Sequence, residues 1–366
     1  MRARHNYRDT HPTPLPDDIR AAVAGQMINH RGEEFADLLR EVRAGVKTVL
    51  DTEGDVILLT SSGTGAMEAA ASNFFSAGDR VLVVRGGVFA NRAVSLTTAF
   101  GLDMEVLDVE WGTGIDPAEI VSRLDARGHR GLFVTHNETS TGVTEDLAAI
   151  GAALGDRDVL FIVDAVSSAA AIPVRTDEWR IDVVYSASQK AWMAPPGLAM
   201  IAVSARAWRF QKLAGLPRFY FDLMTLNDAA DQGQYPWTPA LPAFYAMRLA
   251  LRQFEAEGME LVYARHHETA EGVRRRVRAM GLSLFPHKTV ASDTVTAVRL
   301  PSDVDAVEFC DIARREHDTV FGGGLAHLKN SVFRIGHLGW LDSADIDRSL
   351  EVAETVLGQL THAEAD

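Results

Sequence analysis

Short runs of β-branched and aliphatic residues alternate with amphipathic, helix-like stretches through most of the chain. Helical patterns occupy 17–25 and 33–50. The apolar runs then fall at 56–59, 81–84, 105–108, 132–134, 160–163, 183–185 and 198–201. Alternation of this kind is typical of parallel strands joined by crossover helices. The pattern therefore predicts the α/β fold class, with a mostly parallel sheet covered by helices on both faces.

The pattern changes at both ends of this region. Before it, proline-rich residues 11–16 favour an extended arm. After it, aromatics, glycine and prolines crowd into 210–245, which predicts an ordered loop, and a long helical stretch follows at 241–280. Strand patterns at 294–299 and 332–335 and a closing helix from 343 indicate a small α+β domain. With 366 residues, we expect an arm (1–16), a large domain (17–255) and a small C-terminal domain (256–366).

Composition narrows the possible environments and partners. Hydrophobic residues make up 47% of the chain and charged residues 23%, as in globular proteins, and the net charge is −14. A strongly acidic chain is a poor partner for nucleic acid or for an anionic membrane, and no apolar run reaches the roughly 18 residues of a membrane span. The single cysteine, Cys310, excludes an intramolecular disulfide and a multi-cysteine metal site. We expect a cytoplasmic protein.

Two charged residues follow apolar runs, at positions where a parallel sheet places ligand-binding residues. Asp164 ends the run at 160–163, and Lys190 comes shortly after the run at 183–185. Ligands of open α/β sheets bind at the carboxyl ends of the strands. A carboxylate beside a lysine is what a pyridoxal phosphate (PLP) enzyme needs, because the lysine forms a Schiff base and the carboxylate pairs with the pyridinium nitrogen. The alternatives are a solvated surface lysine and a helix-capping aspartate.

Two polar segments also lie where a strand pattern ends. Ser62, Gly63 and Thr64 follow one apolar run and open a helix, where glycine and free N–H groups favour a phosphate. A plain strand-to-helix turn explains the same residues. The segment 135–142, which contains Thr139, either contacts the substituents of a cofactor ring or forms a turn.

The order of these motifs resembles the class V aminotransferases of PLP fold type I, most closely the alanine–glyoxylate, serine–pyruvate and serine–glyoxylate group. The motifs are Ser62–Ala69, His136–Gly142, Asp164–Ser168 and Ser188–Lys190 followed by Pro195–Gly197. The resemblance runs from the arm near Pro12 to Gly339. It implies a PLP-dependent transferase fold. It also implies ping-pong transfer of an amino group from a small amino acid, such as alanine or serine, to a 2-oxo acid, such as glyoxylate or pyruvate.

The resemblance also implies roles for individual residues. Lys190 would bond covalently to PLP, Asp164 would pair with the ring nitrogen, and Arg334 would bind the substrate carboxylate. Tyr235 and Thr238 would reach the phosphate of a neighbouring subunit, which implies a homodimer. The residues expected to contact the cofactor within one subunit are Ser62, Gly63, Thr64, Phe89, Thr139, Asp164, Val166, Gln189 and Lys190.

One departure from the family pattern bears on the substrate. Relatives place a glycine in the arm where this chain has His11, and a larger side chain there would narrow the substrate pocket or meet a second acidic group. His337 is expected to be structural. The alternative functions are a cysteine desulfurase or related PLP lyase, with Cys310 as nucleophile, and a non-catalytic binding protein. Cys310 falls in an amphipathic helical pattern and Lys190, Asp164 and Arg334 are all present, which disfavours both.

Overall fold

The computed structural model describes residues 6–10, 12–340 and 342–362. The central element is a seven-stranded sheet with the strand order β2-β10-β9-β8-β5-β3-β4. Its strands are β2 (Asp55–Leu59), β3 (Arg80–Arg85), β4 (Asp103–Asp108), β5 (Gly131–Thr135), β8 (Leu160–Asp164), β9 (Val183–Ala187) and β10 (Ala199–Val203). β10 runs antiparallel to both neighbours, and the other pairs are parallel. The predicted α/β class and mostly parallel sheet are confirmed.

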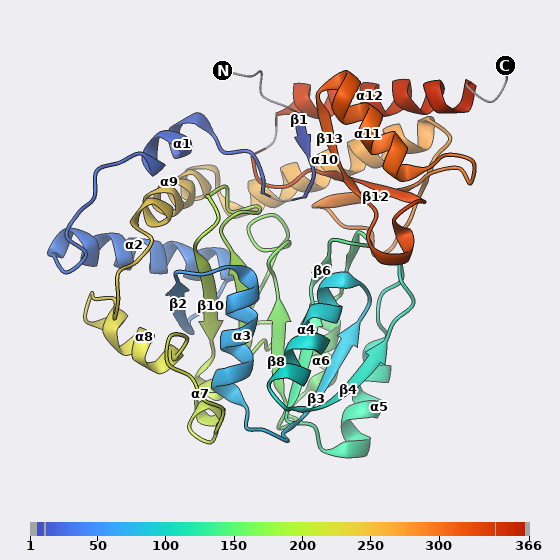
Figure 1. The fold of residues 1–366 in the computed structure, drawn as a ribbon. Coiled ribbons are helices and arrows are strands. Elements are labelled where there is room, and N and C mark those ends of the chain that lie inside the picture. The colour runs from blue at the N-terminus through green and yellow to red at the C-terminus, as the bar shows by residue number, and fades with distance from the viewer. Residues whose placement is uncertain (1–5, 11, 341, 363–366) are drawn as a thin grey trace.

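Helices cover the two faces of this sheet (Figure 1). α3 (Gly63–Phe74) packs on β9 and β10, and α4 (Val88–Ala99) packs on β3, β4 and β5. α2 (Glu33–Leu50) contacts β2 and β10 and also packs against α9 (Leu241–Glu257). The remaining helices of this part are α1 (Asp17–Val23), α5 (Pro117–Arg127), α6 (Leu147–Leu154), α7 (Ala205–Gln211) and α8 (Leu223–Asp231).

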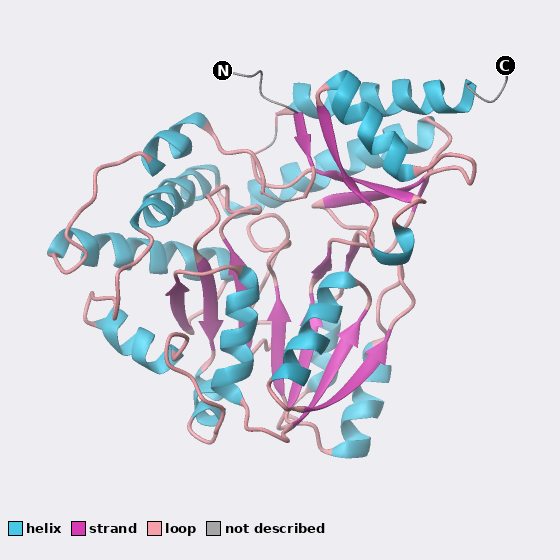
Figure 2. Ribbon diagram, in the orientation of Figure 1, coloured by secondary structure: helices cyan, strands magenta, loops and turns pink. Residues whose placement is uncertain are grey.

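A second sheet of five strands lies beyond the carboxyl ends of the parallel strands, and the arrows of those strands point toward it in Figure 2. Its order is β1-β13-β14-β12-β11. The strands are β1 (Asn6–Arg8), β11 (Ser283–Leu284), β12 (Val295–Arg299), β13 (Thr319–Gly323) and β14 (Val332–Gly336). α10 (Met259–Ala279), α11 (Ala306–His317) and α12 (Ser343–His362) accompany them, with a short 3-10 turn, Ala326–Leu328.

Each sheet has its own hydrophobic core. The core of the second sheet contains three phenylalanines, Phe309, Phe321 and Phe333, whose ring centroids lie 4.5 to 5.9 Å apart. β1 belongs to the amino-terminal arm and pairs in parallel with β13, so the start of the chain joins the sheet of the small domain. The domain boundaries at 16/17 and 255/256 remain a prediction.

Two elements differ from the sequence prediction. The helical stretch at 241–280 is two helices, because Gly258 between α9 and α10 has a φ of 86°, which a side chain disfavours. The region predicted as a loop, 210–245, contains α8. The Asp222 side chain accepts a hydrogen bond from the Thr225 N–H and caps this helix, whose buried face includes Leu223 and Leu226. Crowded prolines and aromatics on either side masked this short amphipathic pattern.

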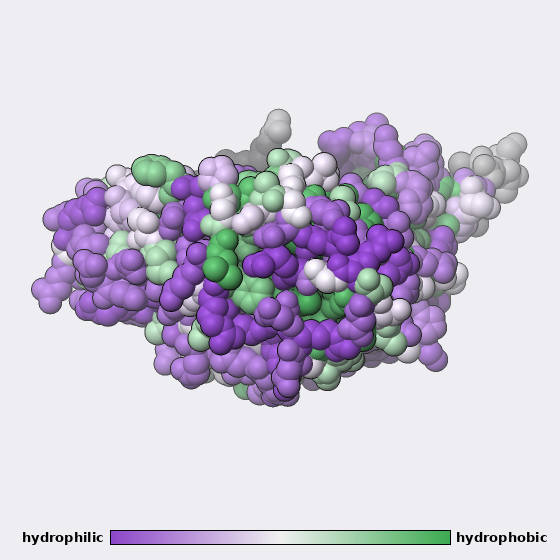
Figure 3. All heavy atoms as spheres, turned by 90° about the horizontal axis from the view of Figure 1, so that it is seen from below, coloured by the Kyte–Doolittle hydropathy of each residue, from purple (hydrophilic) through white to green (hydrophobic). Residues whose placement is uncertain are grey.

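The outer surface is mainly polar. Figure 3 views the molecule from below, where hydrophilic residues cover most of the face and hydrophobic ones form small groups. Large apolar side chains that stay exposed include Leu213, Phe219 and Tyr220, all between α7 and α8. Among the residues described, no helix combines the length and the apolar character that crossing a bilayer requires.

Candidate active site

The predicted cofactor residues meet at the carboxyl edge of the large sheet. Asp164 is the last residue of β8, where it pairs in register with Thr135 of β5 and Tyr185 of β9. Lys190 lies three residues beyond the end of β9. A cavity of about 170 Å³ opens here. The predicted residues that line it are Ser62, Gly63, Thr64, Phe89, Thr139, Asp164, Val166, Gln189 and Lys190.

The loop that carries Lys190 is held by hydrogen bonds on both sides. The Ser188 hydroxyl donates to the Pro195 carbonyl (2.6 Å), and the buried Trp192 indole donates to the Ser186 hydroxyl (2.8 Å). The amino-terminal arm binds the same loop, because the Thr13 hydroxyl donates to the Lys190 carbonyl over 2.9 Å. The backbone around Lys190 is therefore fixed before any ligand binds.

Lys190 itself is 4% exposed, and its Nζ lies 5.9 Å from the centroid of the Phe89 ring. Burial and, to a smaller extent, the nearby Arg334 charge lower its pKa from 10.5 to about 8, although Asp9, Asp164 and Glu138 oppose the shift. A substantial fraction of this amine is neutral near physiological pH, and the neutral form is the nucleophile.

The environment of Asp164 favours a cationic partner for its carboxylate. Burial raises its pKa from 3.8 to about 6, although the Val166 N–H donates to its carboxylate over 2.9 Å. The charges of Lys190 and Arg92 favour the ionised form. A buried carboxylate is stabilised by a cationic partner, so the protonated nitrogen of a pyridine ring fits this position.

The opposite end of the cavity is formed by the start of α3. The Ser62 side chain caps this helix by accepting from the Gly65 N–H (3.3 Å). Gly63 allows a close approach: a Cβ there would stand 2.8 Å from Cγ2 of Val166 and 3.3 Å from Cβ of Ala187. The N–H groups of a first helical turn favour an anion. This end of the cavity therefore fits the phosphate of PLP.

A buried polar network supports the wall between these two ends. The Thr139 hydroxyl donates to the Ser167 hydroxyl over 2.9 Å, and Ser167 donates to the Asn137 carbonyl over 2.7 Å. The side-chain amide nitrogen of Asn137 donates to the hydroxyls of Ser167 and Thr294. Its side-chain oxygen, Oδ1, accepts from the Ser292 hydroxyl over 2.6 Å. The network thus extends from the cavity to residues just before β12.

Arg334 comes from β14, at the centre of the second sheet. It is 3% exposed, and burial lowers its pKa. Its Nε donates to the Gly323 carbonyl (3.0 Å) and its Nη1 donates to the Thr139 carbonyl (3.2 Å). The guanidinium is thus fixed close to the cavity by one contact from the second sheet and one from the loop that follows β5, where a planar fork suits a carboxylate.

The remaining predicted site residues lie elsewhere. Tyr235 is buried, and its hydroxyl donates to the Leu58 carbonyl and accepts from the Thr60 N–H, both at 3.0 Å. Thr238 is exposed. Neither is among the residues that line the cavity. His11 lies outside the described residues, so its predicted effect on the substrate stays a prediction. His337 is fully buried and bonds to Thr296 over 2.8 Å.

Five further residues line the cavity without having been assigned a role from the sequence: Met67, Arg92, Thr135, Asn137 and Ser167. Met67, Thr135, Asn137 and Ser167 lie within or next to the motifs quoted above, whereas Arg92 lies three residues after Phe89 and outside those motifs. Their orientation toward the cavity depends on contacts between elements. Arg92, for example, donates to the Thr64 hydroxyl over 3.1 Å across two helices.

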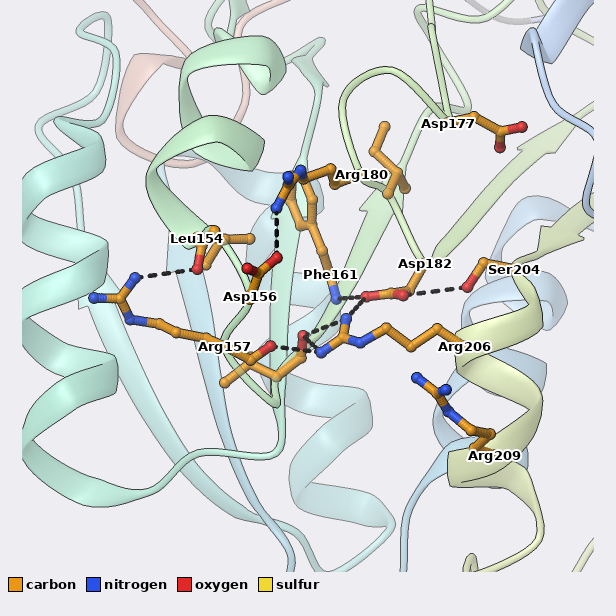
Figure 4. Close-up of a pocket in the computed structure, with 13 residues that line it drawn as sticks. Leu154, Asp156, Arg157, Phe161, Asp177, Arg180, Asp182, Ser204, Arg206 and Arg209 are labelled. Carbon is orange, nitrogen blue, oxygen red and sulfur yellow. Dashed lines mark hydrogen bonds and ion pairs between the residues drawn. The ribbon is translucent and has the colours of Figure 1, made fainter.

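A second hollow, of about 500 Å³, lies at the opposite, amino-terminal edge of the same strands (Figure 4). At its centre the buried Asp182 carboxylate accepts from the Phe161 N–H, the Ser204 hydroxyl and Arg206. Arg206 also donates to the carbonyls of Arg157 and Val159. These contacts join β8, β9 and α7, which explains the cluster structurally. None of the predicted site residues lines this hollow.

Solved structures share the whole fold. An alanine–glyoxylate aminotransferase from Nostoc sp. superposes with a TM-score of 0.94, at 28% identity, over 98% of this chain and 96% of its own. A cysteine desulfurase from Thermococcus onnurineus superposes with a TM-score of 0.77 at 15% identity, which shows a common fold only.

Relatives by sequence also span nearly the whole chain. The small subunit of a soluble hydrogenase from Synechococcus sp. is 40% identical over 95% of this chain and 92% of its own length. An L-aspartate–glyoxylate aminotransferase from Paracoccus denitrificans is 38% identical over 95% of this chain and 90% of its own length. A serine–glyoxylate aminotransferase from Methylorubrum extorquens is 37% identical over 94% of this chain and 89% of its own length. The model of the family described as Aminotransferase class-V matches residues 18–313, and the chain belongs to that family.

Proposed function

We propose that this chain binds PLP and transfers an amino group from a small amino acid, alanine or serine, to a 2-oxo acid, glyoxylate or pyruvate. One observation carries the proposal. The buried Lys190 and the half-buried Asp164 share a cavity with the start of α3, and Arg334 is fixed beside it. The glyoxylate aminotransferases among the relatives support glyoxylate as the acceptor.

Each residue has a defined task in this proposal. When bound, PLP supplies the electron sink for the carbanion formed at the substrate α-carbon. Asp164 pairs with the ring nitrogen, and the first turn of α3 binds the phosphate. Arg334 binds the substrate carboxylate and so orients the α-hydrogen toward Lys190. Lys190, whose pKa of about 8 leaves it partly neutral, takes the proton from the α-carbon as a general base.

A donor-by-acceptor activity matrix tests the proposal. The protein loaded with PLP is mixed with alanine, serine or aspartate, and then with glyoxylate or pyruvate. The visible absorbance of the bound cofactor should fall on adding alanine or serine and return on adding glyoxylate. If none of the donors produces this cycle of absorbance, the proposal is contradicted. Cycling with aspartate alone would reject the donors proposed here and retain the aminotransferase assignment.

The alternative of a cysteine desulfurase has less support. Cys310 lies within α11, it is not among the residues that line the cavity, and burial raises the pKa of its thiol to about 12. A thiol of this kind is protonated at neutral pH, and the thiolate is the nucleophile. Release of sulfide from cysteine by the PLP-loaded protein would favour the lyase.

We propose a homodimer as the working form. Thr238 is exposed in one subunit and lies outside the cavity of its own chain, as expected for a residue that completes a neighbouring site. Tyr235 gives less support, because its hydroxyl is already bonded to the backbone of its own β2 region. The mass of the PLP-loaded protein in solution tests the dimer. In Thr238→Val, weaker PLP binding with unchanged dimerisation would support the role of the side chain.

A further inference from the structure

Arg92 is the one positively charged side chain besides Lys190 that lines the cavity within the described residues. It belongs to the first turns of α4, and its Nη1 donates to the Thr64 hydroxyl over 3.1 Å. Its guanidinium carbon lies 5.2 Å from the centroid of the Phe89 ring. These two contacts place the positive charge beside the start of α3.

That position concentrates positive charge, which the Asp164 carboxylate in the same cavity balances in part. The N-terminus of a helix carries roughly half a positive charge, and a cation nearby is repelled. Within the described part of the chain, Arg92 forms no direct ion pair with a carboxylate, and the charge of Asp164 offsets this repulsion only in part. Lys190, 4% exposed in the same cavity, likewise has no hydrogen bond or ion pair from its Nζ to a described residue. Two basic side chains and a helix start therefore share this space with the single carboxylate of Asp164.

The bond to Thr64 has a second consequence. Because the Thr64 oxygen accepts from Arg92, the hydroxyl proton of Thr64 is free to be donated elsewhere. Thr64 lines the cavity, so a dianion at the start of α3 would receive a hydroxyl donor as well as the N–H groups of the helix. A phosphate has the charge and the three acceptor oxygens for such a site.

We propose that Arg92 is a binding residue for the phosphate of the cofactor, supplying the positive charge of the site and orienting the Thr64 hydroxyl. This inference rests on the proposed binding of PLP. It assigns to Arg92 a contribution to cofactor affinity that is separate from the covalent bond at Lys190.

The test compares PLP with pyridoxal, which has the same aldehyde and ring but lacks the phosphate. Cofactor-free protein is titrated with each compound, and binding is followed by absorbance. Arg92→Gln should weaken PLP binding by roughly tenfold or more, the size expected for losing one charge-assisted hydrogen bond. The same variant should bind pyridoxal with an affinity within about twofold of that of the wild type. Arg92→Lys keeps the charge without the fork, and its PLP affinity should lie between those of the wild type and Arg92→Gln.

Arg209→Gln is the matched control. Arg209 is also an exposed helical arginine without an ion pair to a described carboxylate, and it lies beside the hollow at the opposite edge of the sheet. The control should bind PLP and pyridoxal as the wild type does. Thermal unfolding of both variants shows whether they fold.

Three outcomes would overturn the inference. Equal weakening of PLP and pyridoxal in a folded Arg92→Gln would assign Arg92 to the ring or to the fold. Unchanged binding of both would leave it without a role in cofactor affinity. Unchanged PLP affinity with selective loss of activity toward aspartate would assign it to the distal carboxylate of a substrate. If wild-type protein binds neither compound, the proposed function fails first, and the two failures are thereby distinguished.

Discussion

The hydroxyl of Thr139 donates a hydrogen bond to the hydroxyl of Ser167 over 2.9 Å, in a region where both residues are almost fully buried. Ser167 also accepts from the Asn137 amide and donates to the Asn137 carbonyl. Every hydrogen-bonding capacity of this serine is therefore used. Its three bonds fix the wall of the cavity on which the proposed ring contact, Thr139, depends.

Ser167→Ala should lower the free energy of unfolding by about 1–3 kcal/mol, because buried donors of Thr139 and Asn137 lose their acceptor. Urea denaturation measures the change. Ser95→Ala is the control, since the Ser95 hydroxyl bonds only to a carbonyl of its own exposed helical turn. A loss no larger than that of the control would mean that the network adds little to stability.

The pKa of Lys190 predicts the pH dependence of cofactor capture. Because the neutral amine attacks the aldehyde, the rate of covalent PLP binding to cofactor-free protein should rise with pH and level off above about 8. A free lysine analogue should continue to rise toward its ordinary pKa of 10.5. Stopped-flow absorbance over a pH series gives both profiles. A protein profile that follows the analogue would contradict the lowered pKa.

The same shift has a consequence for stability, with a defined sign. Between pH 8 and 10.5 the unfolded chain retains a proton on Lys190 that the folded chain has released. The stability of the cofactor-free protein should therefore increase with pH across this window, relative to Lys190→Met. Denaturation of both proteins at pH values across the window measures the difference, and parallel curves would argue against the shift.

Asp164→Asn should slow the first half-reaction by roughly a hundredfold or more, because a neutral amide stabilises a protonated ring nitrogen poorly. The rate is measured in a single turnover of the PLP-loaded protein with alanine. Asp116→Asn serves as the control: Asp116 caps α5 at an exposed position, and asparagine caps equally well. A near-normal rate in Asp164→Asn would remove Asp164 from its proposed role.

Gly63→Ala should displace the start of α3, because the added Cβ would stand 2.8 Å from a methyl carbon of Val166. We expect a cost of about 1–3 kcal/mol in unfolding free energy and weaker PLP binding. Gly358→Ala is the matched control, since a Cβ at this position of α12 meets no atom within 4 Å beyond its chain neighbours and the backbone of its own helix. If both variants bind PLP normally and unfold alike, the close packing at Gly63 is unimportant for the site.

The sequence predicted the parts of the site that follow from strand ends. A polar residue directly after an apolar run in a parallel sheet reaches the carboxyl edge, so Asp164 and Lys190 could be located without coordinates. The family resemblance then supplied the roles of Phe89 and Thr139, which follow the ends of β3 and β5, and it supplied Arg334, which lies in the second sheet. The division of the chain into domains and the roles of the site residues remain predictions.

What could not be predicted depends on contacts between distant segments. Arg92 reads as an ordinary helical arginine until α3 and α4 are placed side by side. From the sequence alone, Ser167 is one of two serines in a turn. Its hydrogen bond with Asn137 depends on the fold, which places the two residues in contact. The break between α9 and α10 was missed because hydrophobic periodicity continues on both sides of Gly258.

The bond from Arg334 to the Thr139 carbonyl joins a strand of the second sheet to a loop of the first. The distance from the Arg334 guanidinium, the proposed anchor of the substrate carboxylate, to Lys190 is therefore set by how the two sheets are docked, and not by either one alone. Substitutions on the docking face, remote from the cavity, would tilt one sheet and change which amino acids react, while every residue in the cavity stayed the same.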